Sequence, residues 1–141
     1  MHRLYVILGL FLLFTYASGG VIDVGQNKAF GSLRVAVISS LPGDTLYVFP
    51  GIYREGSIVI DKPLVIIGKD QPVLDGENEY GILSVESDSV VIRGLTLKDV
   101  GISYVEDLAA IKIIKSSHCT IESNQLINAF FGIYLERSSD C

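Results

Sequence analysis

The chain contains few of the side chains that bind soft metals or form disulfide networks. It has two cysteines, Cys119 and Cys141, one methionine, which is the initiator, and two histidines. Two cysteines do not make a disulfide framework, and soft metals prefer Cys, Met and His as ligands. Lysine and arginine together number 11 against 16 acidic residues, which gives a formal net charge of −5. This balance excludes a basic surface for nucleic acid.

The sequence motifs of common catalytic sites are also missing. No glycine-rich phosphate loop precedes a helix, and no serine or cysteine nucleophile is arranged with a usable histidine. Glycosidases and lyases need carboxylates or basic side chains that converge on a groove. The acids of the middle region are instead scattered among turns: Asp70, Asp75, Glu77, Glu79 and Asp88. We therefore expect a protein that is not an enzyme.

The N-terminus has the layout of a secretory signal. Met1-His2-Arg3 is a short basic lead, and residues 4–16 are apolar except for Gly9 and Thr15. Small residues follow and allow cleavage after Gly19. A membrane anchor, which needs ~20 apolar residues, is the alternative if the apolar run continues through Ile22. Either alternative predicts export of the rest of the chain.

The last third of the chain repeats itself. Residues 110–119 match residues 132–141 at an offset of 22, and residues 91–97 match residues 120–126 at an offset of 29. The two offsets agree if the seven residues 101–107 are an insertion between strands. A repeat period in the low twenties is typical of a solenoid.

The repeats consist of short alternating strands. Ile111, Ile113 and Cys119 are separated by polar residues, so one set faces inward and the other faces water. Leucine-rich repeats have a similar period, but they need a leucine consensus and a helix-forming half that this chain lacks. The sequence predicts an all-β fold, a right-handed single-stranded parallel β-helix whose coils of ~22 residues stack ~4.8 Å apart.

A short amphipathic helix is predicted to cap the first coil. Phe30, Leu33, Val37 and Leu41 recur at spacings of three and four, and Ser32 is the expected N-cap. The Pro-Gly pair that follows ends the helix. Such a cap covers the open strand edges and the apolar end of a solenoid.

These patterns divide the chain into three parts. A signal peptide is expected at 1–19, a polar lead-in with the capping helix at 20–43, and β-helix coils at 44–141, with the first strand at 44–49. The sequence stops in mid-repeat without a capping segment. We therefore expect an N-terminal fragment of a longer solenoid.

Several blocks resemble known families. Pro-Gly-Asp-Thr-Leu at 42–46 and Pro-Gly-Ile-Tyr-Arg-Glu at 50–55 are similar to the opening of secreted pectate-lyase-like β-helices. Ile-Asp-Lys-Pro-Leu at 60–64 and Phe-Gly-Ile-Tyr-Leu at 131–135 resemble the periplasmic NosD family, which assists maturation of the copper centre of nitrous oxide reductase. The NosD resemblance extends over most of residues 35–135.

The resemblance implies a periplasmic accessory protein that works beside a membrane ABC transporter. Its partners would be the transporter components, a copper chaperone and nitrous oxide reductase. The matched positions are corners and inward-facing side chains, so no catalytic or binding residue carries over. Copper is possible in the full-length protein, whereas no cofactor is expected in this fragment.

Three residues are weak candidates for metal ligands: His118, Cys119 and Cys141. The alternation points His118 outward and Cys119 inward, which is poor geometry for a shared site. Cys119 and Cys141 occupy equivalent positions one coil apart, and this favours a stack of small buried side chains. A disulfide in an oxidising compartment and a metal-binding thiol pair are the alternatives, although parallel neighbouring strands suit a disulfide badly.

The insertion at 101–107 is the best candidate for a binding site. We expect it to protrude from the stack and to present Tyr104, Glu106 and Asp107. Loops on rigid scaffolds commonly carry binding residues. A tolerated insertion at a corner predicts the same sequence pattern.

Two other functions fit a parallel β-helix. One is a carbohydrate-binding, polysaccharide-cleaving or epimerising protein whose active coils lie beyond residue 141. In this part of the chain, Arg93 and Lys115 could line a groove with Glu122, Glu136 and Arg137, but a mixed-charge solvent face with cross-strand pairing explains the same pattern. The other alternative is a surface adhesion solenoid.

Overall fold

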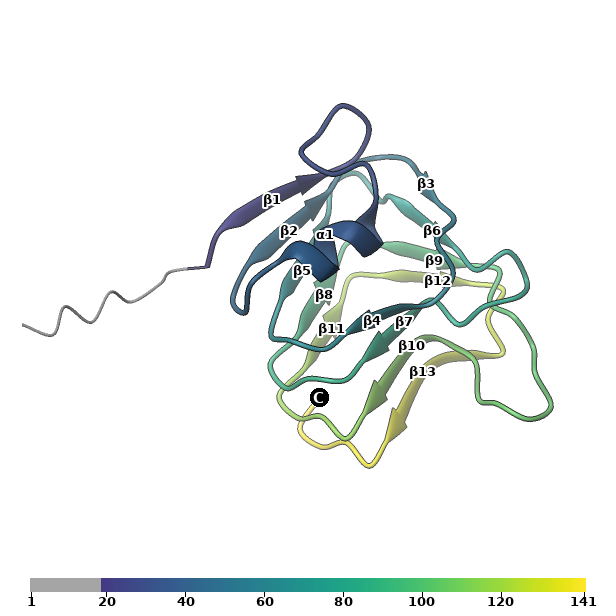
Figure 1. Cartoon of the computed structure of the whole chain (residues 1–141). Coiled ribbons are helices and arrows are strands. Elements are labelled where there is room, and N and C mark those ends of the chain that lie inside the picture. The colour runs from purple at the N-terminus through teal and green to yellow at the C-terminus, as the bar shows by residue number, and fades with distance from the viewer. Residues whose placement is uncertain (1–18) are drawn as a thin grey trace, which may run out of the picture.

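The computed structural model describes residues 19–141 (Figure 1). The predicted signal peptide, whether cleaved or retained as an anchor, lies outside these residues apart from Gly19. Between residues 19 and 141, no helix has the length and apolar character needed to cross a membrane.

The described residues form one helix and a series of short strands. The helix is α1 (Leu33–Ser39). The strands are β1 (Val21–Val24), β2 (Thr45–Val48), β3 (Ile52–Tyr53), β4 (Ile58–Ile60), β5 (Val65–Gly68), β6 (Val73–Asp75), β7 (Leu83–Val85), β8 (Val91–Arg93), β9 (Thr96–Lys98), β10 (Ala109–Ile114), β11 (Thr120–Glu122), β12 (Gln125–Ile127) and β13 (Phe131–Glu136).

The strands form three parallel sheets that the chain visits in turn. The first sheet has the order β1-β2-β5-β8-β11, the second β12-β9-β6-β3 and the third β13-β10-β7-β4. Each coil contributes one strand to each sheet, so that β2, β3 and β4 are followed by β5, β6 and β7 directly below (Figure 1). This arrangement confirms the predicted parallel β-helix with a short N-terminal helix.

The strand registers confirm both sequence offsets. Ile111 pairs with Ile133 between β10 and β13, and Val91 pairs with Thr120 between β8 and β11. Residues 99–108 connect β9 to β10, whereas only residues 128–130 connect β12 to β13. The upper connection is longer by seven residues, which accounts for the difference between the offsets.

Inward-facing aliphatic side chains stack from coil to coil. In the first sheet Leu46, Ile66 and Ile92 are fully buried at matched register positions. Complete burial of such a side chain stabilises the fold by roughly 1.5–3 kcal/mol. In the third sheet, Ile111 and Ile113 are likewise fully buried, whereas their partners Ile133 and Leu135 on β13 are exposed, because no further strand covers them in the described chain.

Helix α1 covers the opposite end of the stack. Ser32 is its N-cap, as predicted, and its hydroxyl accepts a hydrogen bond from the Val35 amide. Its buried residues are Leu33, Ala36 and Val37. The predicted apolar stripe was too long at both ends: Phe30 precedes the helix and bridges to Val24, and Leu41 lies beyond the C-cap and is exposed.

The first strand begins earlier than the sequence indicates. Val21–Val24 form β1, which pairs in parallel with β2, whereas the expected first strand was 44–49. The Asp44 carboxylate accepts a hydrogen bond from the Gly20 amide at 2.7 Å and fixes the start of β1. The residues taken for a polar lead-in therefore include an edge strand of the first sheet. The predicted division into a signal peptide at 1–19, a lead-in with helix at 20–43 and coils at 44–141 is in other respects still a prediction.

Candidate functional site

The insertion loop, residues 101–107, has a fixed base and an exposed tip. The Gly101 amide donates to the Tyr80 carbonyl at 2.9 Å, and the Val100 amide donates to the Asn128 carbonyl at 3.1 Å. Val100 is buried, whereas Ile102, Tyr104 and Val105 are exposed. The loop therefore joins the coil above it to the coil below it and presents its apolar tip to solvent.

The backbone of the tip is held by a serine. The hydroxyl of Ser103 accepts hydrogen bonds from the amides of Val105 and Glu106 at 3.2 and 3.1 Å. The Leu108 amide then donates to the Glu106 carbonyl at 3.1 Å. These local bonds are the kind that serine supplies in tight turns, and they order a loop that has no regular secondary structure.

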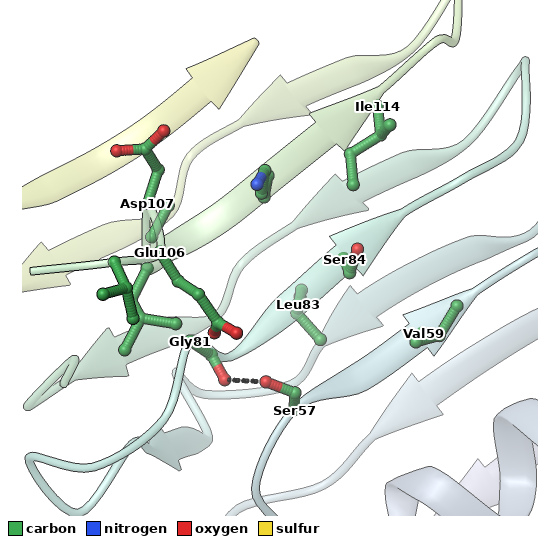
Figure 2. Close-up of a pocket in the computed structure, with 12 residues that line it drawn as sticks. Ser57, Val59, Gly81, Leu83, Ser84, Glu106, Asp107 and Ile114 are labelled. Carbon is green, nitrogen blue, oxygen red and sulfur yellow. Dashed lines mark hydrogen bonds between the residues drawn. The ribbon is translucent and has the colours of Figure 1, made fainter. Parts of the chain in front are cut away.

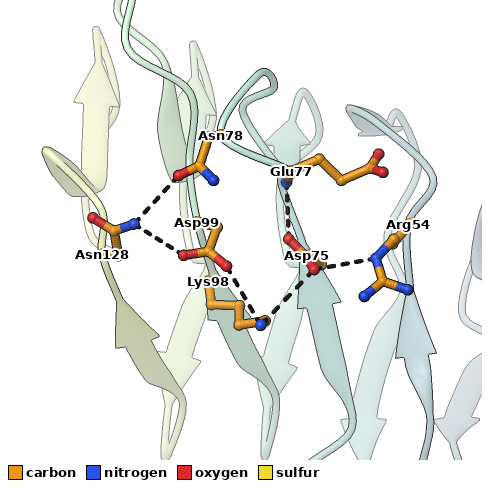
Figure 3. A network of polar contacts seen from close by, with 7 residues as sticks. All are labelled: Arg54, Asp75, Glu77, Asn78, Lys98, Asp99 and Asn128. Atoms are coloured by element: carbon orange, nitrogen blue, oxygen red, sulfur yellow. Dashed lines mark hydrogen bonds and ion pairs between the residues drawn. The ribbon is translucent and has the colours of Figure 1, made fainter.

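A polar network stabilises the neighbouring corners (Figure 3). Asp75 is buried and forms ion pairs with Arg54 at 3.3 Å and with Lys98 at 3.9 Å. Lys98 also lies 3.4 Å from Asp99, whose carboxylate accepts a hydrogen bond from the Asn128 side-chain amide at 2.9 Å. The Asn128 bond is the main cause that lowers the pKa of Asp99. Because these charges are mutually satisfied, the network is a scaffold element rather than a reactive site.

A groove of about 530 Å³ runs along the outer face of the third sheet, beside the insertion loop (Figure 2). Its floor comes from β4, β7 and β10, and one wall comes from the loop. Glu106 extends toward Ser57 and Gly81, whereas Asp107 points away from them (Figure 2). The lining residues are Ser57, Val59, Gly81, Leu83, Ser84, Val105, Glu106, Asp107, Leu108, Ala109, Lys112 and Ile114.

Most polar groups of this groove already have partners within the protein. The Ser57 hydroxyl donates to the Gly81 carbonyl at 2.6 Å, and Lys112 lies 3.4 Å from Glu136. Tyr134 on β13 is the register partner of Lys112 on β10. A hydrogen bond to the Asp107 carboxylate raises the pKa of the Tyr134 phenol. The Ser84 hydroxyl donates to the Glu86 carboxylate at 3.2 Å, so most polar side chains of the groove are already engaged within the protein.

A second depression, the apolar hollow, lies on the other side of the same loop. It has a volume of about 370 Å³ and is lined by Gly101, Ile102, Ser103, Tyr104, Glu106, Leu108, Phe130 and Phe131. The rings of Phe130 and Phe131 pack edge to face, with centroids 4.8 Å apart. The hollow combines one wall from the insertion loop with one wall from the corner before β13.

The structure separates the three loop residues predicted for binding. Asp107 faces the groove, Tyr104 faces the hollow, and Glu106 lines both. Phe130 was not predicted, although an aromatic pair directly after a strand corner could have indicated it. Lys112 and Ser84 of the groove follow from the alternation along β10 and β7, but which loop borders them depends on the fold.

Of the three candidate metal ligands, the thiols of Cys119 and Cys141 lie near each other. His118 is exposed at a corner, and its Nδ1 lies 3.1 Å from the Ser117 hydroxyl. Cys119 is buried and Cys141 is exposed, both as free thiols. Burial is the main cause that raises the pKa of the Cys119 thiol, and Cys141 is close enough to add to this shift. Within residues 19–141, no three His, Cys, Asp or Glu side chains are grouped to hold a metal ion.

The charged residues that could have lined a groove in a carbohydrate-active protein lie on two different sheets. Arg93 on β8 pairs with Glu122 on β11 at 3.5 Å, on the first sheet. Lys112 and Glu136 pair on the third sheet. Cross-strand charge pairing therefore accounts for Arg93 and Glu122, as the alternative interpretation predicted, whereas Lys115 and Arg137 take part in no salt bridge within residues 19–141.

Comparison with known proteins supports the resemblance to NosD that residues 60–64 and 131–135 indicated. The chain is 30% identical over 108 residues to a Pseudomonas aeruginosa protein named "Probable ABC transporter binding protein NosD". The chain is similar to NosD. The match covers 73% of this chain but 25% of the relative, so the chain spans about a quarter of the length of NosD. No protein-family model matches the chain, and no solved structure matches it.

Proposed function

We propose that the protein is an exported, non-catalytic accessory protein of the NosD kind. It assists maturation of the copper centre of nitrous oxide reductase, in the periplasm and beside an ABC transporter. The observation that carries this proposal is the similarity to NosD over 108 residues, because the name of that relative refers to an ABC transporter. The parallel β-helix supports it as a rigid scaffold for protein contacts.

The insertion loop is our candidate for contact with a partner. Tyr104, Glu106 and Asp107 are all exposed, and the local bonds of Ser103 hold the backbone around them in one conformation. A preordered loop loses less conformational entropy on binding than a mobile one. The partners in this proposal are a transporter component, a copper chaperone and the reductase.

The proposal is tested in the source bacterium by deleting the gene and measuring copper bound to purified nitrous oxide reductase. We expect copper-poor reductase in the deletion strain and normal copper after complementation with the natural gene. The triple variant Tyr104→Ser, Glu106→Gln, Asp107→Asn should restore copper only in part, although its protein level stays normal in the periplasmic fraction. Fully loaded reductase in the deletion strain would refute the maturation role.

The groove favours one second candidate, a carbohydrate-binding β-helix. The carboxylate of Glu106 lines this open surface, beside Asp107, which is bonded to Tyr134, and Ser84, whose hydroxyl donates to Glu86 and keeps its acceptor sites. Such groups commonly bind sugar hydroxyls through hydrogen bonds. Binding assays with uronate polymers and neutral polysaccharides distinguish this candidate, since an accessory protein of the NosD kind should bind none of them with measurable affinity.

A further inference from the structure

The apolar hollow gathers large apolar side chains that the fold does not bury. Phe130 is 75% exposed, Ile102 is 72% exposed, and Tyr104 is fully exposed. Single exposed apolar residues need no explanation, but several together around a depression mark an interaction site. The volume of about 370 Å³ lies in the range of small binding sites, ~300–1,000 Å³.

The walls of the hollow are ordered before anything binds. On one side, the Gly101 amide donates a hydrogen bond to the Tyr80 carbonyl, and the Ser103 hydroxyl accepts hydrogen bonds from two backbone amides. On the other side, Phe130 packs against Phe131, which in turn packs edge to face on Tyr134 with centroids 5.5 Å apart. A preformed aromatic pocket of this type is suited to anchor one large side chain of a partner.

The surroundings of the hollow are acidic. Residues 76–81 and 99–108 contain Glu77, Glu79, Asp99, Glu106 and Asp107 but no lysine, arginine or histidine. Lys98 and Lys112, which flank residues 99–108 in the sequence, are already paired with acids. In residues 19–141, no salt bridge involves Glu77, Glu79, Glu106 or Asp107.

This charge argues for one kind of occupant. A second copy of the chain on a twofold axis would place the same acidic corner against itself, which is unfavourable. An anionic membrane surface would be repelled for the same reason. A cationic partner segment would instead be attracted and oriented by the acids.

We propose that the apolar hollow binds a segment of a partner protein that presents a large apolar side chain flanked by lysines or arginines. The apolar side chain packs between Tyr104 and Phe130, and the flanking cations lie near Glu106 and Glu79, with Asp107 adding its negative charge from the groove side of the same loop. This inference names the chemistry of the partner proposed above and rests on that proposal only for the existence of a partner.

The test uses three synthetic peptides that share a Leu-Phe-Leu core and carry paired lysines, paired serines or paired glutamates at both ends. Their affinity for the full chain is measured by isothermal titration calorimetry at low and at physiological salt. We expect the lysine peptide to bind most tightly, the serine peptide more weakly and the glutamate peptide not at all. Added salt should weaken only the lysine peptide toward the serine value.

Matched variants locate the site. Phe130→Ser and Tyr104→Ser should each weaken the lysine peptide by about tenfold or more, as anchor residues do. Ile38→Ser on helix α1, where the side chain is 69% exposed, is the control and should leave the affinity unchanged. Glu106→Gln with Asp107→Asn should remove most of the salt dependence, whereas Asp61→Asn with Asp70→Asn should preserve it.

Three results would overturn the inference. These are equal binding of the serine and lysine peptides, equal weakening by Ile38→Ser and Phe130→Ser, or a concentration-dependent dimer of the wild type that Phe130→Ser abolishes. The last result would assign the hollow to a second copy. The peptide assay does not involve the reductase, so peptide binding with unaffected reductase copper would refute the maturation role and leave the inference intact.

Discussion

The carboxylate of Glu55 and the ammonium of Lys62 hold opposite ends of the same helix, α1. Glu55 accepts hydrogen bonds from the amides of Leu33 and Arg34, each at 3.0 Å. Lys62 donates to the carbonyls of Val37, Ile38 and Ser40 at 3.1, 3.3 and 2.9 Å. Both residues come from the first full coil, so this coil fixes its own cap. The signs of the two charges also complement the helix dipole.

Replacing Glu55 with Gln should destabilise the protein by about 1–2 kcal/mol. The amide keeps one acceptor oxygen but loses the charge that strengthens bonds to the first-turn amides and to the Ser32 hydroxyl. Urea unfolding followed by circular dichroism measures the change. Glu86→Gln, on an exposed residue that caps no helix, is the matched control. An equal loss in both variants would show that general charge, and not the cap, is responsible.

Lys62→Met should remove the cationic contact at the helix C-terminus while it retains most of the apolar stem. We expect a loss of about 1 kcal/mol, and the loss should shrink as salt screens the interaction in the wild type. Lys69→Met is the control, because Lys69 lies over the Tyr47 ring on the first sheet and does not touch α1. A salt-independent difference for Lys62→Met would indicate that packing rather than charge explains it.

The sequence repeat predicted correctly which residues stack on one another, because matching positions of the repeat occupy the same place in successive coils. Ile111 over Ile133 and Val91 over Thr120 follow from sequence offsets alone, since each coil imposes the same inward pattern on its neighbours. The difference between the two offsets likewise predicted the length of the insertion. Strand β1 was missed because its four residues alternate only weakly, with one exposed and one buried residue at the ends and two half-buried residues between.

The candidate site was predicted only in part. Tyr104, Glu106 and Asp107 were identified because an insertion interrupts the repeat, and a loop tip on a regular scaffold is conspicuous in sequence. Phe130 lies far along the chain from this loop, so only the stacking of coils brings it to the hollow. The two sides of the loop, one polar and one apolar, likewise depend on tertiary structure.

Gly68→Ala should destabilise the protein strongly. A Cβ at position 68 would overlap the carbonyl oxygen of Gly94 in the next coil and lie 2.9 Å from Cδ of Pro72. Because backbone cannot move aside without disturbing the sheet, we expect a cost of about 1–3 kcal/mol or more. Gly31→Ala is the control, since nothing lies within 4 Å of a Cβ there. Thermal unfolding of both variants provides the comparison, and equal midpoints would contradict the close approach of the two coils.

Asp44 should contribute to acid unfolding. Its carboxylate accepts hydrogen bonds from the amides of Leu41 and Gly20 at 2.8 and 2.7 Å. These hydrogen bonds lower the pKa of Asp44 below the ordinary value of 3.8. The folded protein therefore binds this proton less readily than the unfolded chain does. The resulting stabilisation is complete above pH 3.8 and is lost as the pH falls through the lowered pKa of the folded state.

Asp44→Asn removes this titration. The difference in unfolding free energy between wild type and Asp44→Asn should be largest near neutral pH and should diminish below pH 3.8. Urea unfolding across the acid range measures it, with Asp61→Asn as a control for the loss of one exposed carboxylate. A difference that stays constant from neutral pH into strong acid would mean that the Asp44 charge does not hold β1 to the first full coil.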